Sequence, residues 1–156
     1  MPHDHGSPVV ILMADDDADD RMLARDAVEE SRLANPLYFV EDGQELMDYL
    51  HRVGRYATED APRPGIILLD LNMPRKDGRE ALREIKSDPD LRSIPVVVLT
   101  TSKTEEDILR SYDLGANSFI TKPVTFERLV DIVRTLGLYW FNIVQLPGVP
   151  AAAPNG

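Results

Sequence analysis

Five short, predominantly apolar segments alternate along this chain with segments of helical periodicity. The apolar segments are Val9–Ala14, Leu37–Val40, Ile66–Leu71, Ile94–Thr100 and Asn117–Thr121. Their apolar residues run consecutively and do not alternate with polar ones. This pattern is typical of strands in a parallel sheet that is covered on both faces. We therefore predict an α/β fold with a doubly wound, five-stranded parallel sheet and helices on both faces.

Helical signals stand between these segments. Asp17 is a candidate cap for a first helix, whose expected apolar stripe is Leu23, Ala24, Ala27 and Val28. The stripe expected for the second helix is Leu46, Met47, Leu50 and Val53. Gly54–Gly65, with two prolines and two glycines, is predicted to be a long loop. A last helix is expected to begin near Thr125.

Length and composition limit the possibilities further. The chain has 156 residues, which suits one domain. Its net charge of −10 argues against a nucleic-acid-binding surface. No apolar run is long enough to span a membrane, and the first residues lack the features of a signal peptide. The absence of cysteine excludes disulfides and favours an intracellular location. Together with the lack of a membrane-spanning run, this leads us to expect a cytoplasmic protein without membrane contact.

The expected domain organisation has four parts. Residues 1–8 are predicted to be a flexible N-terminus, and residues 9–136 form the folded domain. Residues 137–147 are expected to be an aromatic extension of the last helix. Residues 148–156, rich in proline and alanine, are predicted to be a disordered tail.

Polar side chains gather where the predicted strands end. Ligands of open α/β sheets bind outside the carboxyl ends of the strands. The polar residues at these ends are Asp15, Asp16, Asp70, Thr100, Thr101, Thr121 and Lys122. In isolation each has a simpler explanation, such as a helix cap, a turn or a solvated charge. Together, at four strand ends, they predict one shared site.

Four motifs in order give the chain a resemblance to a known family. They are "ADDD" after the first strand, "LLDLNMPRKDG" around Asp70, "VVVLTTS" at the fourth strand and "GANSFITKPV" at the fifth. With them the chain resembles the receiver domains of two-component response regulators, of the chemotaxis-regulator type. The resemblance implies the flavodoxin-like strand order 2-1-3-4-5.

The resemblance also implies a role for each site residue. Asp70 would be the phosphoacceptor, assisted by Thr100 and Lys122. Mg²⁺ (or Mn²⁺) would be held by Asp15, Asp16, Asp70 and the backbone carbonyl of Asn72. The remaining acids of the block, Asp17, Asp19 and Asp20, are assigned to the start of the first helix, where the helix dipole favours them.

Two conformational features follow from the same resemblance. Thr100 and Phe119 would form the switch that reports phosphorylation, with phenylalanine where many receivers carry tyrosine. The Lys122–Pro123 peptide bond is expected to be cis. Cis bonds are otherwise a small minority of bonds that precede proline.

The expected partners are a sensor histidine kinase and a second copy of the chain. The long loop Gly54–Gly65 and the aromatic run after Leu136 resemble the single-domain regulators of bacterial and cyanobacterial phytochromes, which carry no output enzyme domain. We expect a homodimer through the fourth and fifth helices, the fifth strand and the extension. The expected interface residues are Tyr139, Trp140, Phe141 and Ile143. Alternatively, Gly137 ends the helix and this segment folds back over its own domain.

Three other functions stay open at this point. A pseudo-receiver that never takes phosphate is opposed by the complete set of site residues. A phosphatase of the haloacid-dehalogenase type would need a second acid where Asn72 stands. A flavodoxin-like or nucleotide-binding protein would need a glycine-rich phosphate loop, and the loops after the strands contain none.

Overall fold

A five-stranded parallel sheet with the order β2-β1-β3-β4-β5 forms the centre of the molecule. The computed structural model describes residues 9–30, 35–110 and 115–135. The strands are β1 (Ile11–Ala14), β2 (Leu37–Val40), β3 (Ile66–Asp70), β4 (Val96–Thr100) and β5 (Ser118–Thr121). The predicted doubly wound α/β fold and its strand order are confirmed.

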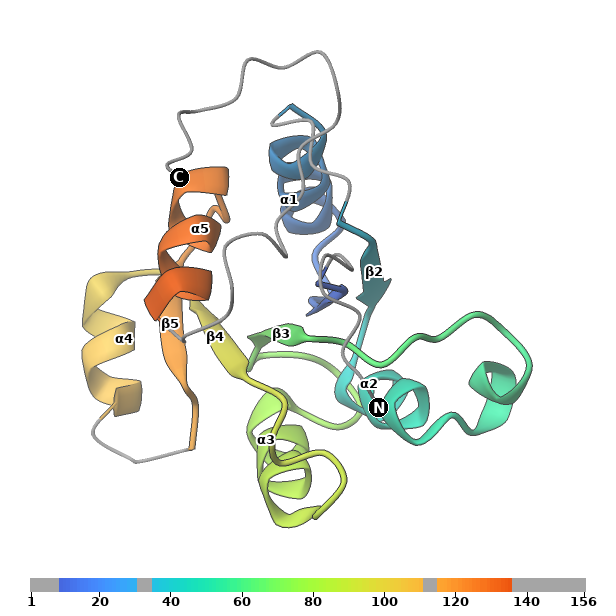
Figure 1. Ribbon diagram of the computed structural model, residues 1–156. Coiled ribbons are helices and arrows are strands. Elements are labelled where there is room, and N and C mark those ends of the chain that lie inside the picture. Colours follow the sequence, from blue (N-terminus) through green and yellow to red (C-terminus); the bar gives the residue numbers. More distant parts are fainter. Residues whose placement is uncertain (1–8, 31–34, 111–114, 136–156) are drawn as a thin grey trace.

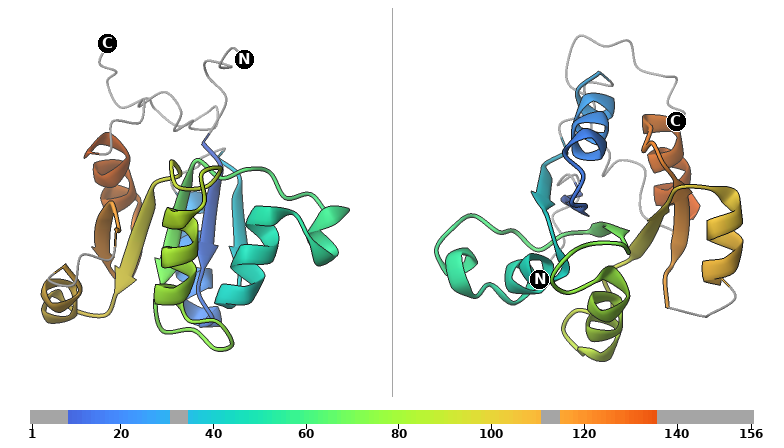
Figure 2. Two further views of the ribbon diagram at one scale, coloured as in Figure 1. Left: turned by 90° about the horizontal axis from the view of Figure 1, so that it is seen from below. Right: turned by 180° about the vertical axis from the view of Figure 1, so that it is seen from behind.

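Helices cover both faces of this sheet (Figure 1). Their bounds are α1 (Ala18–Glu30), α2 (Gly43–His51), α3 (Gly78–Ser87), α4 (Lys103–Arg110) and α5 (Phe126–Thr135). Helices α1 and α5 lie on one side of the sheet, and α2 and α3 lie on the other (Figure 2). Helix α4 lies beside β4 and β5. None of the helices that the structure describes has the length and apolarity needed to cross a membrane.

The strands supply the two cores because alternate residues point to opposite faces. In β1, Leu12 and Ala14 join the core beneath α2 and α3. Ile11 and Met13 join the smaller core beneath α1 and α5, where Ala24 is also buried. All four described residues of β1 are at most 1% exposed, which explains the unbroken apolar run in the sequence.

Aspartate caps start three of the helices. Asp17 Oδ1 accepts hydrogen bonds from the amides of Asp19 at 2.8 Å and Asp20 at 3.3 Å. Asp42 and Asp77 cap α2 and α3 in the same way. Each carboxylate satisfies amides that have no partner within the first turn of the helix. The predicted role of Asp17 is therefore confirmed.

Some local predictions were wrong. Leu23, expected on the buried stripe of α1, is 47% exposed, and its neighbour Met22 is 60% exposed. Val53 lies outside α2, because Arg52 takes a left-handed conformation with φ 57° and ends that helix. The predicted loop at 54–65 contains one turn of 3₁₀ helix, Gly54–Ala57.

This 3₁₀ turn is anchored by tyrosines. Tyr56 is buried and its ring centroid lies 5.1 Å from that of Tyr49. The Tyr49 hydroxyl donates to the carbonyl of Pro62 at 2.9 Å, and Tyr38 donates to Asp60 at 2.7 Å. The 3₁₀ turn and the irregular residues that follow it therefore have a defined path beside α2.

Parts of the expected organisation fall outside the described residues. Residues 1–8 and everything after residue 135 belong to this group, so the predicted N-terminus, the extension 137–147 and the tail 148–156 stay predictions. The same holds for the four expected interface residues, which are Tyr139, Trp140, Phe141 and Ile143.

Candidate phosphoacceptor and metal site

The sheet register brings the predicted site residues to one edge. Ala14 pairs with Leu69, so Asp15 follows β1 at the level where β3 ends with Asp70. Thr100 pairs with Thr121 at the ends of β4 and β5, and Lys122 follows directly. Residues from four separate segments therefore meet at the carboxyl edge of the sheet, as the rule for open α/β sheets predicts.

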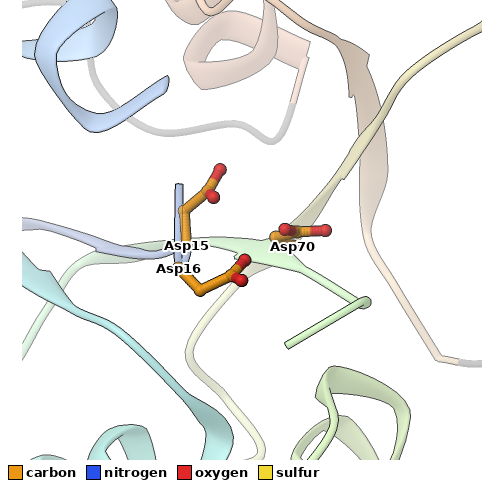
Figure 3. Close-up of side chains that lie close together, drawn as sticks. All are labelled: Asp15, Asp16 and Asp70. Atoms are coloured by element: carbon orange, nitrogen blue, oxygen red, sulfur yellow. The ribbon is translucent and has the colours of Figure 1, made fainter. Parts of the chain in front are cut away.

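Three carboxylates form the centre of this site. Asp15, Asp16 and Asp70 each offer an oxygen, and these oxygens all lie within 4.8 Å of one another (Figure 3). Asp15 is fully buried, Asp70 is 8% exposed, and Asp16 is exposed. Hard oxygen donors at this spacing suit a divalent cation such as Mg²⁺ or Mn²⁺. The donor set therefore fits the ion that the sequence analysis predicted.

Lys122 lies among these carboxylates. Its Nζ is 2.8 Å from Asp15 Oδ2, 2.7 Å from Asp20 Oδ2 and 3.6 Å from Asp70 Oδ2. Burial by itself would lower the pKa of the Lys122 ammonium. The close ion pair with Asp15, the hydrogen bond to Asp20 and the nearby negative charges outweigh burial, so the pKa is raised and the lysine stays charged.

For the two buried aspartates, Asp15 and Asp70, burial has a larger effect on the pKa than the nearby positive charge and hydrogen bonds. Burial raises the pKa of Asp15, although the Lys122 ammonium and the amide of Asp17, 2.9 Å away, act against it. Burial also raises the pKa of Asp70, opposed by the amide of Asn72 at 3.1 Å and by Lys122. The carboxylates are therefore held in a setting that favours an added positive charge.

The loop after Asp70 is fixed by two glycines. A Cβ atom at Gly78 would lie 2.5 Å from the carbonyl oxygen of Asp70, and one at Gly43 would lie 2.0 Å from that of Lys76. The Gly78 amide donates to the carbonyl of Leu71, and the Gly43 amide donates to that of Lys76, both at 2.9 Å. Only residues without a side chain allow this close approach, so the loop is held against α2 and α3.

The other predicted residues occupy the following places. Thr100 is fully buried, and its hydroxyl donates to the carbonyl of Ile120 at 3.4 Å. Phe119 is 5% exposed in the core beside α4. The Lys122–Pro123 peptide bond is cis. For Asn72 the structure gives the bond from its amide to Asp70, and the role of its carbonyl stays a prediction.

Sequence reasoning missed two sets of contacts. Asp20, assigned only to the start of a helix, also binds Lys122, which is 102 residues away along the chain. The guanidinium of Arg110 lies 4.3 Å from the centroid of the Phe119 ring, and its Nε is 2.9 Å from Glu106 Oε2. The i,i+4 spacing of Glu106 and Arg110 could have indicated their ion pair. No local pattern indicates the contact between Asp20 and Lys122.

Comparison with known proteins agrees with this geometry. Residues 11–134 match the family described as the response regulator receiver domain. The response regulator Rcp1 of Synechocystis sp. is 42% identical over 147 residues, which cover 94% of this chain and 99% of Rcp1. The crystal structure of the Mn²⁺-bound form of Rcp1 has a TM-score of 0.66 at 42% identity, and covers 90% of this chain and 100% of that one.

Two further solved structures are similar. The bacteriophytochrome response regulator AtBRR has a TM-score of 0.80 and 40% identity, and the match covers 86% of this chain and 96% of that one. The phosphorylated cyanobacterial phytochrome response regulator RcpA has a TM-score of 0.68 and 45% identity, with coverages of 91% and 100%. The chain therefore belongs to the response regulator receiver family of two-component signalling and is related to the phytochrome response regulators.

Proposed function

We propose that Asp70 accepts a phosphoryl group from a sensor histidine kinase and that the phosphorylated chain is the signalling state. The observation that carries this proposal is the meeting of Asp15, Asp16, Asp70 and Lys122 at one edge of the sheet. A carboxylate oxygen of Asp70 attacks the phosphorus of a phosphohistidine. The new P–O bond forms while the P–N bond breaks, and the electron pair stays on the imidazole nitrogen, which takes up a proton.

The chain supplies positioning and charge for this transfer, which are the main requirements of phosphoryl transfer. The amide of Asn72 orients the Asp70 carboxylate. Lys122 places a compact positive charge beside it, within reach of an incoming phosphoryl oxygen. The Thr100 hydroxyl would serve a second phosphoryl oxygen. A bound Mg²⁺, held by Asp15, Asp16, Asp70 and the carbonyl of Asn72, would neutralise the remaining negative charge.

The test uses mass spectrometry of the intact protein. With Mg²⁺ and acetyl phosphate, we expect the gain of one phosphoryl group. Asp70→Asn should gain none while keeping its fold. The control is Asp90→Asn, which should behave like the original protein, because Asp90 is exposed in the turn after α3 and is not one of the three carboxylates of the site. Full labelling of Asp70→Asn would show that the acceptor lies elsewhere. Absence of labelling in the original protein, also with a phosphorylated kinase, would favour the pseudo-receiver.

The proposed kinase is a bacterial phytochrome in the cytoplasm. Support comes from the similarity to RcpA and AtBRR, whose names connect them to phytochromes, over most of the chain. We expect phosphotransfer from a phytochrome kinase to be at least tenfold faster, in kcat/KM, than transfer from an unrelated histidine kinase. Equal rates for both donors would contradict the proposed partner.

The proposed output is a repacking around Thr100 and Phe119. Phosphate on Asp70 would draw the Thr100 hydroxyl away from the Ile120 carbonyl and free space for the Phe119 ring. The Arg110 guanidinium that covers this ring would move with it, which would change the surface of α4. Backbone NMR shifts in α4 and β5 should change when a phosphoryl analogue binds with Mg²⁺. Changes confined to the loops around Asp70 would contradict this coupling.

We also propose a homodimer through α4, β5, α5 and the segment 137–147. On the described surface, Ile108 of α4 is 51% exposed and would belong to this interface. Light scattering should give about twice the chain mass of 17.5 kDa. A chain that ends after Gly137 should associate much more weakly. A full-length monomer at tens of micromolar, with and without phosphate, would contradict the dimer.

A further inference from the structure

Asp20 is an acid in the first turn of α1 that the proposed chemistry does not use. Its Oδ2 lies 2.7 Å from Lys122 Nζ, and this is the shortest of the three contacts between the ammonium and a carboxylate. The side chain of Asp20 is 24% exposed and that of Lys122 is 14% exposed. Such a partly buried ion pair, with a hydrogen bond, is stronger than a pair on the open surface.

Lys122 and a divalent cation compete for the same oxygens. The ammonium is within 2.8 Å of Asp15 and within 3.6 Å of Asp70, and both residues belong to the candidate metal site. The closer the ammonium lies to these two carboxylates, the less negative charge they offer to a metal ion. Lys122 therefore has to stay near Asp70 for the phosphoryl transfer. At the same time another acid has to offset part of its positive charge, so that Asp15 and Asp70 can bind a metal ion.

Asp20 is placed to provide that neutralisation. It comes from α1 and not from a strand end, and its amide is bound to the capping carboxylate of Asp17. Its carboxylate is not a member of the group of three that could hold the ion. It can therefore keep its contact with Lys122 when Asp15 turns to a metal ion.

We propose that Asp20 is a positioning residue that holds the Lys122 ammonium on the α1 side of the site and so leaves Asp15 and Asp70 available to Mg²⁺. This inference rests on the proposed function, because it assumes that the three aspartates bind the ion. Without Asp20, Asp15 and Asp70 are the acids left to hold the ammonium among the residues that the structure describes, and the ammonium opposes metal binding more strongly.

The chain offers a matched control in Asp19. It lies in the same helical turn as Asp20, carries the same charge, and its amide is bound to the same capping residue. Its side chain is exposed, and the ion pairs of Lys122 do not include it. Asp19→Asn therefore removes the same charge from α1 without touching Lys122.

The experiment measures Mg²⁺ affinity by titration calorimetry on the full chain. We expect Asp20→Asn to weaken binding about five- to tenfold, the order of one charge-assisted hydrogen bond. Asp19→Asn should change the dissociation constant less than about twofold, as a screened surface charge does. Asp20→Glu, which restores the carboxylate, should recover at least half of the loss on a logarithmic scale. Circular dichroism establishes that each variant is folded.

A double-mutant cycle separates positioning from simple charge. In a Lys122→Met background, Asp20→Asn should no longer weaken Mg²⁺ binding, because no ammonium is left to compete. An undiminished effect in that background, or equal effects of Asp19→Asn and Asp20→Asn, would overturn the proposal. Failure of the original protein to bind Mg²⁺ would instead contradict the metal site itself, so the two failures are distinguishable.

Discussion

Two partly buried lysines lie at opposite edges of the same sheet. Lys122, at the carboxyl edge, is surrounded by Asp15, Asp20 and Asp70, and its pKa is raised. Lys86, at the amino edge, donates to two neutral oxygens, the Asn117 side chain at 3.1 Å and the backbone carbonyl of Arg92 at 3.5 Å. Among the described residues no carboxylate lies within ion-pair distance of Lys86, and burial lowers its pKa.

The difference shows that the two edges are organised for different purposes. At the amino edge Asn117 also accepts a hydrogen bond from the first amide of β4 at 2.9 Å, so polar groups there support the sheet. At the carboxyl edge three like charges are gathered although they repel one another. Such an arrangement costs stability, which is typical of a functional site.

The largest effect is expected from removing one of the crowded charges. Asp16→Asn should abolish measurable Mg²⁺ binding, because the site loses an exposed carboxylate that would contact the ion. In chelator the same variant should melt at an equal or higher temperature than the original protein, since one repulsion is gone. Calorimetry and thermal melts measure both. Unchanged Mg²⁺ affinity would exclude Asp16 from the metal site.

A matched pair of substitutions tests the comparison itself. Lys122→Met should destabilise the metal-free protein by about 2 kcal/mol, because it leaves the buried Asp15 carboxylate without its counter-ion. Lys86→Met should change the free energy of unfolding by less than about 0.5 kcal/mol, because it removes a half-solvated charge that has no carboxylate partner within the described part of the chain. Urea unfolding at neutral pH gives both values. Equal costs at the two edges would contradict the contrast between them.

The smallest expected effect is a pH dependence of the protein's stability that comes from Asp70 at the carboxyl edge. The pKa of Asp70 in the folded chain is raised above its ordinary value of 3.8. Below about pH 3.8 Asp70 is protonated in both the folded and the unfolded chain, and it does not reduce the free energy of unfolding. As the pH rises through the folded-state pKa, Asp70 ionises at a cost in the folded chain, so the free energy of unfolding falls. In chelator, the excess melting temperature of Asp70→Asn over the original protein should be small near about pH 4 and larger near about pH 7. An excess that shrinks with rising pH would contradict the raised pKa.

Whether a feature of the fold or of the site could be predicted from the sequence depends on how far apart along the chain the contacting residues are. The unbroken apolar runs, such as that ending at Ala14, predicted the parallel sheet, and the rule for strand ends then placed Asp15, Asp70 and Thr100 at one edge. The cap at Asp17 depends on neighbours within three residues and was also predicted correctly. These features are local or follow from topology.

What could not be predicted depends on how distant elements pack. Leu23 fits the periodicity of a buried stripe, yet the way α1 lies on the sheet leaves it exposed. The contact between Asp20 and Lys122 joins the first helix to the end of the last strand, and the contact between Arg110 and Phe119 needs the position of α4. Side-chain spacing along the chain contains no information on such placements.

The two glycines that fix the loop after Asp70 have a practical consequence. The amide protons of Gly43 and Gly78 are bound to carbonyls of that loop, one from each of the helices that flank it. Their exchange with deuterated solvent therefore reports the separation of the loop from α2 and from α3 independently. The molecule thus carries two built-in probes that can time the movement of the loop on each side without any attached label.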